Sequence, residues 1–242
     1  SRSYEIKEYS PNTDINKSAL PLEFSSVNLG KKQIQTLITD SLTNSQMGVL
    51  YNALEGLKEK DEDYSLTDVE DAVEKEESSA KWNLLNYLEQ LEDSGLFSEN
   101  PVDPRDLVEE GRASVINLKA VEPDNAEMAV YLLAKNLFDL RKSDEIPPCI
   151  MVFEEAHNFI PEKGFGQAIS NPIMRKIASE GRKFGVGIGV ISQRPARIDK
   201  NVLSECNTQF ILKVTNPNDL NAISKSFEGV SSEVEGMSKS LP

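Results

Sequence analysis

The sequence predicts an α/β fold, a mostly parallel β-sheet flanked by helices, with a helical insertion in the N-terminal half. Two observations support this. From about residue 112, short apolar runs alternate with amphipathic helices, which is typical of a parallel sheet covered on both faces. Before that point, apolar residues are spaced three and four apart, as in helices. We therefore expect a mainly helical part at residues 1–111 and an α/β part at residues 112–242.

The first part contains three predicted helices after a short alternating stretch at residues 4–9. One helix begins at about Asn44, one opens at Thr67, and one runs through Trp82 and stops at Gly95. Thr67-Asp-Val-Glu70 matches a capping box, in which a hydroxyl and a carboxylate each satisfy a free backbone N–H group. The acidic stretch at residues 58–77 is most simply a solvated helical surface.

The second part alternates strands and helices. Asn171-Pro172 and Asn216-Pro217 each place a capping side chain before a proline, which suits a first helical turn. In chain order we expect a strand at 113–118, a helix at 126–140, a strand at 149–153, a loop at 161–170, a helix at 172–183, a strand at 185–192, a short helix around Asn201, a strand at 208–214 and a helix from Pro217.

Composition narrows the class of protein. At 242 residues the chain can bury a sizeable core. It has no apolar run long enough to span a membrane and no signal peptide at its start, so we expect a soluble, cytoplasmic protein with no membrane partner. Cys149 and Cys206 lie in or beside apolar segments, which favours a role as small core residues. Two cysteines and one histidine without close spacing argue against structural zinc.

The formal net charge of −14 by itself argues against nucleic-acid binding, because affinity for DNA comes mostly from cations placed on phosphates. The acidic residues, however, are concentrated in the first 145 residues. Positive charge gathers in one segment, residues 171–200, which holds only two acids and seven cations. The cations are Arg175, Lys176, Arg182, Lys183, Arg194, Arg197 and Lys200.

Two carboxylates, Glu154 and Glu155, follow the apolar strand at residues 149–153. The carboxyl end of a strand is where open α/β sheets bind their ligands. In a phosphohydrolase, the first acid there holds the hydration shell of Mg²⁺ and the second polarises the attacking water. Glu pairs are common, however, so a strand that ends in a solvated acidic turn is an equal alternative at this point.

The next strand ends in Ser192-Gln193-Arg194-Pro195. A neutral amide beside two acids can bind a water and a γ-phosphate oxygen together, although the same sequence could be a simple turn. The helix between the strands places Arg175 and Arg182 on one side and apolar residues on another. Guanidinium groups suit phosphate, and a solvated helix face is the plainer alternative.

Five short motifs together resemble those of archaeal HerA and its HerA/FtsK relatives. The resemblance covers roughly residues 112–228. The motifs are Glu154-Glu-Ala-His-Asn-Phe-Ile-Pro161, Ile177-Ala-Ser-Glu-Gly-Arg-Lys-Phe-Gly185, Val190-Ile-Ser-Gln-Arg-Pro195, Leu203-Ser-Glu-Cys-Asn-Thr208 and Val214-Thr-Asn-Pro217.

This resemblance implies a RecA-like ATPase that uses ATP and Mg²⁺. Members of the family form homohexameric rings around double-stranded DNA and act in end resection with a partner nuclease. Glu155 would be the catalytic carboxylate, Gln193 the sensor of the γ-phosphate, and Glu154 a ligand of Mg²⁺ through water. Arg182 would be an arginine finger that reaches the nucleotide of the neighbouring subunit, with Arg175 as a weaker candidate for contacting nucleotide.

The sequence departs from the family in two places. Aspartate is the commoner residue at the position of Glu154, and the longer side chain still permits contact through a water. No G-x-x-x-x-G-K-[ST] phosphate loop occurs, and the nearest match, Leu29-Gly-Lys-Lys32, has no hydroxyl residue after the lysine. We therefore expect a fragment or a shortened form that is inactive alone.

The missing loop also affects the expected sheet. Family members carry the loop upstream of these motifs, on a central strand, and continue into a further strand after Ser224-Lys-Ser-Phe227. We therefore expect a RecA-like sheet that is incomplete relative to the family. Without the central strand, the strands at 185–192 and 208–214 would lack their common neighbour and leave open edges.

Two other functions remain open. A metal-dependent hydrolase centred on Glu154, Glu155 and His157 would need more ligands than one histidine supplies. A non-catalytic scaffold would instead bind protein partners through the acidic helical part. If the chain acts on DNA, we expect either the loop at 161–170 or the side chains Arg194, Arg197 and Lys200 to contact it.

Overall fold

The chain divides into two units in the computed structural model, which describes residues 5–38 and 41–226. Unit 1 comprises Ser1–Leu107 with Gly111–Ala129, and unit 2 comprises Val108–Glu110 with Val130–Pro242. Each unit has its own parallel sheet and its own helices, so the predicted α/β class is confirmed. Tyr4 and Phe227, which belong to two of the sequence predictions, lie outside the described residues.

The sheet of unit 1 has the strand order β2-β1-β3, and both pairings are parallel. Its strands are β1 (Glu5–Ser10), β2 (Leu20–Pro21) and β3 (Arg112–Ile116). β1 pairs along its length with β3, in the register Glu5↔Arg112 to Tyr9↔Ile116. The first strand of the predicted helical part thus shares a sheet with the first strand of the predicted α/β part, and the division at residue 111 remains a prediction.

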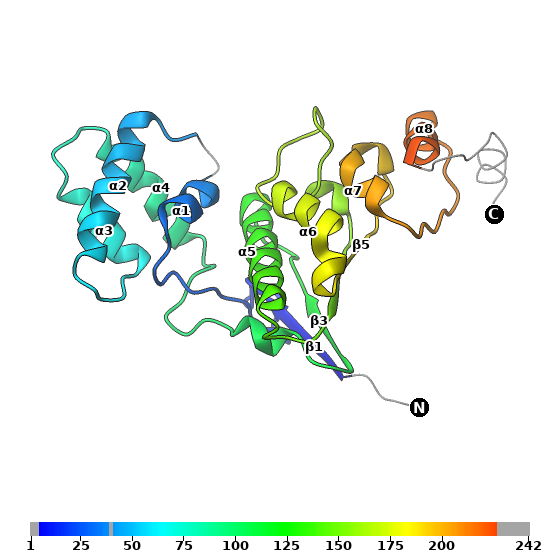
Figure 1. The fold of residues 1–242 in the computed structure, drawn as a ribbon, viewed down its shortest axis with the longest axis horizontal. Helices are drawn as coiled ribbons and strands as arrows, with labels where there is room; N and C mark the ends of the chain where they lie inside the picture. Colours follow the sequence, from blue (N-terminus) through cyan, green and yellow to red (C-terminus); the bar gives the residue numbers. More distant parts are fainter. Residues whose placement is uncertain (1–4, 39–40, 227–242) are drawn as a thin grey trace. The chain divides into compact units, whose positions relative to one another are not determined.

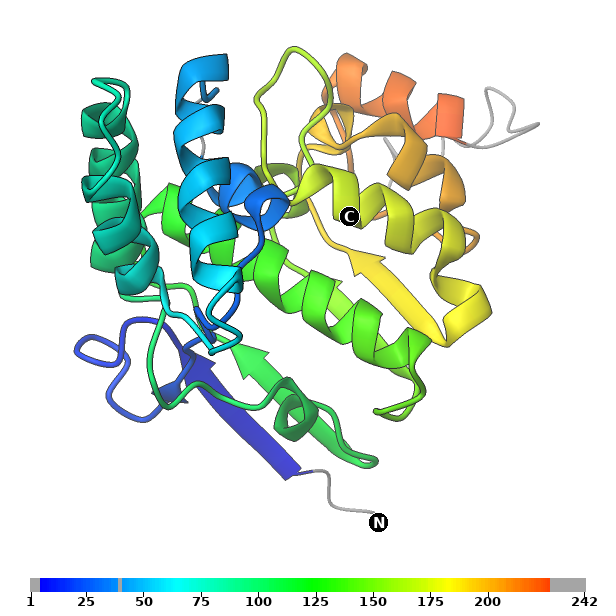
Figure 2. The same ribbon diagram turned by 60° about the vertical axis from the view of Figure 1, so that its left-hand side comes forward.

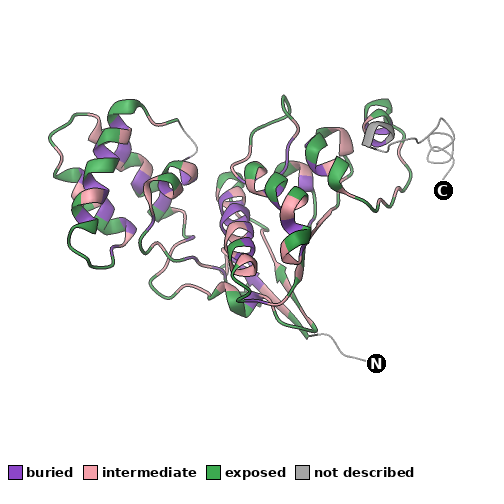
Figure 3. Cartoon of the chain, viewed as in Figure 1, coloured by how far each residue is buried: buried purple, intermediate pink, exposed green. Residues whose placement is uncertain are grey.

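The helices of unit 1 form a small bundle, in which α3 packs against both α2 and α4. Residues coloured as buried in Figure 3 lie along these helices, and Leu50, Leu54, Val69, Leu84 and Leu88 are almost completely buried. The predicted helices at Asn44, Thr67 and Trp82 are confirmed. The bundle comprises α1 (Lys31–Leu37), α2 (Asn44–Lys58), α3 (Leu66–Glu74) and α4 (Lys81–Asp93).

The predicted capping box of α3 is wrong by two residues. Ser65 is the N-cap residue and its hydroxyl accepts a hydrogen bond from the backbone of Asp68, whose carboxylate accepts one in return from the backbone N–H of Ser65. Ser65 and Asp68 have the same three-residue spacing as the predicted pair, so the pattern allowed both alternatives. Leu66 is buried, and the helix therefore starts early enough to include it.

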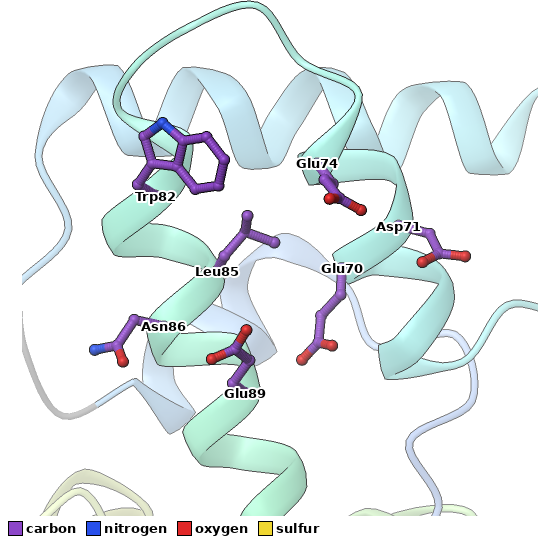
Figure 4. Close-up of a pocket in the computed structure, with 7 residues that line it drawn as sticks. All are labelled: Glu70, Asp71, Glu74, Trp82, Leu85, Asn86 and Glu89. Carbon is purple, nitrogen blue, oxygen red and sulfur yellow. The ribbon is translucent and has the colours of Figure 1, made fainter.

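Glu70 instead borders a hollow of about 260 Å³ between α3 and α4 (Figure 4). Its pKa is raised to about 7 by burial, with further contributions from Glu92 and Glu89. One carboxylate oxygen of Glu70 is buried without a hydrogen-bond partner. The other residues lining the hollow are Asp71, Glu74, Trp82, Leu85, Asn86 and Glu89.

Unit 2 is built on a pair of parallel strands, β4 (Cys149–Phe153) and β5 (Val186–Val190), in the register Cys149↔Val186 to Phe153↔Val190. The helix α6 (Asn171–Phe184) packs across β5 (Figure 2). Ile177 and Gly181 are buried on its inner face, as the spacing predicts. The helix α5 (Pro123–Lys142) contacts α6 where the rings of Phe138 and Phe184 meet edge to face at 5.6 Å.

Asn171 was predicted to cap α6 and does not. Ser170 occupies the N-cap position, and Asn171 is the first residue of the helix. The Asn171 amide nitrogen donates to the carbonyl oxygen of Pro161 at 2.9 Å, so this side chain ties the preceding loop to the helix. The Ser170 hydroxyl likewise donates to the carbonyl of Phe159 at 2.7 Å.

The remaining elements of unit 2 are short. They are the helices α7 (Lys200–Glu205) and α8 (Pro217–Ser226) and the 3-10 turns η2 (Ala156–Asn158) and η3 (Pro195–Arg197). A further 3-10 turn, η1 (Pro104–Leu107), belongs to unit 1. Within the described residues, no helix is long and apolar enough to cross a membrane.

The predicted strand at residues 208–214 is wrong. The segment is irregular and pairs with no strand in the described part of the chain. Phe210 and Leu212 are 92% and 80% exposed. A β-strand needs a neighbouring strand that pairs with its backbone N–H and C=O groups. A strand-like sequence alone does not ensure that such a neighbour exists.

Candidate functional site

The carboxyl ends of β4 and β5 bring two predicted site segments together. β4 ends at Phe153, directly before Glu154 and Glu155, and β5 ends three residues before Gln193. Backbone pairing continues past the strand ends, because Ile191 N–H donates to the Phe153 carbonyl at 2.9 Å and Ala156 N–H donates to the Ile191 carbonyl at 3.0 Å. The two segments are therefore held at a fixed offset.

Glu155 has an unusual backbone conformation for a residue with a side chain. Its φ and ψ angles are 46° and 45°, in the left-handed region. Such a conformation costs roughly 1–2 kcal/mol for a residue other than glycine. It occurs two residues after the end of β4 and leads into the turn η2. The Glu155 carboxylate is 47% exposed.

Two polar side chains, Gln193 and His157, contact this carboxylate, and Ser192 contacts His157; we call the four residues together the Glu155 cluster. Gln193 Nε2 donates to Glu155 Oε1 at 3.5 Å, a long contact. His157 Nδ1 lies 3.3 Å from Glu155 Oε2 and 3.1 Å from Ser192 Oγ. The structure thus brings together the predicted residues Glu155 and Gln193, and adds His157 and Ser192 to them.

Glu154 is different from its neighbour. It is exposed, and no hydrogen bond or ion pair occupies its carboxylate among the residues that the structure describes. A free, solvated carboxylate suits a hydrated Mg²⁺, which keeps most of its waters when a protein binds it. In the described ranges no group of three or more His, Cys, Asp or Glu side chains is arranged to hold a metal ion directly.

The two candidate arginines of α6 have different surroundings. Arg182 lies exposed in the last turn of the helix, and the structure shows no ion pair for it within the described residues. Arg175 donates through Nε to Asp199 Oδ2 at 2.8 Å and makes a second, shorter contact to the same oxygen through Nη2. Asp199 is completely buried. This ion pair gives Arg175 a structural role that the sequence did not reveal.

Asp199 also caps α7, because its Oδ1 accepts from the backbone N–H groups of Asn201 and Val202 at 2.9 and 3.3 Å. Burial alone would raise the pKa of Asp199, but the hydrogen bonds and charge of Arg175 and the two backbone donors outweigh it and lower the pKa. An aspartate before a short helix is a recognisable cap signal. Its partner Arg175, 24 residues away, could not be identified from sequence spacing.

The three predicted DNA-contacting cations lie close together in sequence and are all exposed. Lys200 pairs with Glu162 at 2.7 Å, and this contact lowers the pKa of Glu162. Arg197 lies 5.6 Å from the ring of Phe165, in the loop at 161–170. The Arg194 side chain makes no hydrogen bond or ion pair among the described residues. The structure thus links two of the three cations to elements around that loop.

A second missed residue, Asp219 of α8, fixes the segment that carries Arg194 and Arg197. The Asp219 side chain is buried and its Oδ1 accepts from the Ala196 N–H at 3.0 Å. α8 packs against η3 through this contact. Asn216-Pro217 signalled the start of the helix, but no local pattern indicated what Asp219 would bind.

Comparison with known proteins finds archaeal helicases among the relatives of this chain. Over 173 residues the chain is 32% identical to the DNA double-strand break repair helicase HerA of Saccharolobus solfataricus, a match that covers 68% of this chain and 34% of that protein. Over 87 residues it is 44% identical to HerA of Pyrococcus furiosus, covering 36% of this chain and 15% of that protein. No protein-family model matches the sequence.

Among solved structures, VirB4 of Thermoanaerobacter pseudethanolicus superimposes with a TM-score of 0.68 at 14% sequence identity. The superposition covers 98% of this chain and 76% of that one. At this identity the likeness shows the fold, a RecA-like arrangement of parallel strands flanked by helices. The chain spans about a third of the length of the Saccharolobus HerA that it matches.

Proposed function

Because this chain is a homologue of the archaeal HerA helicases, we propose that it supplies the catalytic half of an ATP-driven DNA translocase active in double-strand break repair. The observation that carries this proposal is the contact between Gln193 Nε2 and Glu155 Oε1. It joins the two strand ends at the position where α/β sheets bind ligands.

We assign the chemistry of ATP hydrolysis to three residues. Glu155 orients and polarises the attacking water, and Gln193 bonds the γ-phosphate without adding charge. Glu154 binds Mg²⁺ through water, and its exposed carboxylate supports this assignment. When bound, Mg²⁺ supplies positive charge that stabilises the phosphate oxygens. The geometry favours this division, because the Glu155 carboxylate is already engaged by Gln193 and Glu154 is not.

Arg182 is proposed to act on the nucleotide of a neighbouring subunit in a ring, a hexamer by analogy with the family. Its exposure and lack of an ion pair among the described residues support this role, since a finger residue must be free to reach another chain. Arg175 is the weaker candidate, because its guanidinium is engaged by the buried Asp199.

Double-stranded DNA is the proposed partner, with Arg194, Arg197 and Lys200 directed toward its phosphates. Arg194 is the strongest of the three, because the other two already have partners in Phe165 and Glu162. We further propose that a nuclease cooperates with the complete assembly in end resection. The cytoplasm, where chromosomal DNA is accessible in archaea, is the corresponding location.

The 242-residue chain is proposed to be inactive by itself, because it contains no G-x-x-x-x-G-K-[ST] to bind the phosphates of ATP. The test compares the chain with a fusion in which the phosphate-loop segment of the Saccharolobus HerA precedes it. We expect the chain alone to bind no radiolabelled ATP, and the fusion to hydrolyse ATP faster when double-stranded DNA is added. A fusion that binds ATP but never hydrolyses it would contradict the proposal.

The same fusion tests whether Arg182 acts between subunits. Subunits carrying Arg182→Ala and subunits carrying Glu155→Gln should each be inactive alone. Mixed together, they form some interfaces in which an intact Glu155 faces an intact Arg182, so partial turnover should return. Absence of recovery at every mixing ratio would count against action in trans.

The alternative is a non-catalytic scaffold that binds proteins through the acidic helices of unit 1. The acidic hollow beside Trp82 is the observation that favours it. The two functions differ in the fusion experiment, because a scaffold gains no ATP turnover when a phosphate loop is supplied.

A further inference from the structure

We propose that His157 is a positioning residue that holds Oε2 of Glu155 and thereby assigns Oε1 as the oxygen that receives the attacking water. This inference rests on the proposed function. It assigns different roles to the two oxygens of one carboxylate, because Oε2 is held by His157 and Oε1 receives the water. Neither Gln193 nor Glu154 contacts Oε2.

The imidazole is better fixed than the carboxylate it contacts. The His157 side chain is 15% exposed, whereas that of Glu155 is 47% exposed. His157 lies in η2, whose backbone is closed by a hydrogen bond from Asn158 N–H to the Glu155 carbonyl at 2.9 Å. A largely covered ring on a closed turn can therefore serve as a support for a more exposed side chain.

The hydrogen-bond partners indicate which ring nitrogen carries the proton. A carboxylate only accepts hydrogen bonds, so a hydrogen bond across the 3.3 Å between Nδ1 and Glu155 Oε2 requires a proton on Nδ1. Ser192 Oγ, 3.1 Å from the same nitrogen, accepts from the Arg194 backbone N–H at 3.0 Å and can share the Nδ1 proton. The cluster thus favours the Nδ1–H form of the neutral ring.

The two carboxylate oxygens are consequently in different situations. Oε2 is held by a nitrogen that the fold fixes. Among the residues that the structure describes, Oε1 has only the long contact of 3.5 Å to Gln193, an exposed side chain. When Gln193 turns toward a γ-phosphate, Oε1 loses its partner while Oε2 keeps His157. A carboxylate with one oxygen held and one free can accept a hydrogen bond from water in a defined direction.

The chain contains one histidine, so ¹⁵N-histidine labelling of the whole chain gives the signals of a single imidazole. At pH 9 we expect the Nδ1–H form in the wild-type chain. Glu155→Ala removes the acceptor, and the ring should shift toward the Nε2–H form. The matched control is Glu154→Ala, which removes the adjacent carboxylate that does not contact the ring, and should leave the spectrum unchanged.

An Nε2–H ring in the wild-type chain, or equal responses to Glu155→Ala and Glu154→Ala, would overturn the inference. This readout needs no ATP turnover, so it is independent of the proposed function.

In the ATP-hydrolysing fusion, His157→Asn places an amide nitrogen near the position of Nδ1 and should keep kcat within about threefold. His157→Gln places it near Nε2 and should lower kcat about tenfold or more with KM unchanged; equal kcat values would also overturn the inference.

Discussion

Arg175 and Arg182 lie on the same helix, yet the fold uses them differently. Arg175 neutralises Asp199, which is buried and also caps α7. Arg182 is exposed in the last turn. Identical side chains on one helix therefore separate into one that holds unit 2 together and one that remains available to another molecule.

Substitution of each arginine by methionine should reveal this difference in stability. Arg175→Met leaves the buried Asp199 carboxylate without its counter-charge and, with allowance for the solvent exposure of Arg175, should lower the free energy of unfolding by about 2 kcal/mol. Arg182→Met should change it by less than about 0.5 kcal/mol. Chemical denaturation at pH 7 measures both, and equal effects would contradict the structural role of Arg175.

The effect of Arg175→Met should also depend on pH. The pKa of Asp199 is lowered below its usual value of 3.8 in the folded protein. A lowered pKa means that the contribution to stability is complete above about pH 4 and is lost as the pH falls through the folded value. The difference between wild type and Arg175→Met should therefore shrink in strong acid.

Gly181 allows α6 to approach β5 closely. A Cβ atom built at this position would lie 2.5 Å from the carbonyl oxygen of Val186, a backbone atom that cannot rotate away. A glycine is needed here because no space is left for a Cβ atom. The backbone conformation does not require one, since Gly181 lies within a regular helix. It explains why a glycine precedes Arg182 in the middle of an otherwise ordinary helical sequence.

Gly181→Ala should destabilise the protein by about 2 kcal/mol, because the helix must move away from the strand. The matched control is Gly48→Ala in α2, where a Cβ atom meets nothing within 4 Å. That change should stabilise by about 0.5 kcal/mol, since alanine favours helix more than glycine does. Thermal unfolding of both variants gives the comparison, and a neutral Gly181→Ala would refute the close-approach argument.

At the scale of single elements, periodic and apolar patterns were the most informative. The strand at residues 149–153 was predicted with the bounds that the structure has. Because parallel strands end at the same edge of a sheet, the meeting of Glu155 and Gln193 could also be predicted. Residues 208–214 show the limit of this reasoning, since their strand-like sequence has no partner within the described chain.

Contacts between distant elements could not be predicted. The pairing of β1 with β3 joins residues more than 100 positions apart, and helix-like patterns between them gave no sign of it. The helix α1 and the short strand β2 were missed because each is too short to show a clear period. Ion pairs such as that of Arg175 with Asp199 depend on how elements pack, which sequence spacing does not record.

The raised pKa of Glu70 predicts a pH dependence for the helices of unit 1. The pKa is about 7 in the folded protein against 4.5 ordinarily, so folding favours the protonated form. Stability from this group is complete below about pH 4.5 and is lost as the pH rises through 7. After allowance for solvent screening, Tm should be higher at pH 5 than at pH 8 by about 2 °C or more.

Glu70→Gln should remove most of this dependence, because glutamine has no charge to lose. Glu59→Gln at the end of α2, outside the hollow, is the matched control. Circular dichroism at 222 nm across pH 5–8 follows the helices directly. A wild-type slope retained in Glu70→Gln would show that another group is responsible.

At the scale of the whole molecule, the chain combines a RecA-like fold with the residues proposed to form half of an ATPase site. Glu154, Glu155 and Gln193 lie at one edge of the sheet of unit 2, and a phosphate loop is absent from the sequence. The structure therefore separates two requirements of the reaction. In the proposed function, water activation depends on residues present in this chain, whereas phosphate binding depends on a loop that its sequence does not contain.

The central claim is that Glu155 activates water for ATP hydrolysis, and turnover by the Glu155→Gln fusion tests it most directly. Glutamine has nearly the same shape but cannot accept a proton, so ATP binding should persist while kcat falls by about a hundredfold or more. A Glu155→Gln fusion that binds ATP and hydrolyses it at the rate of the unsubstituted fusion would contradict the account.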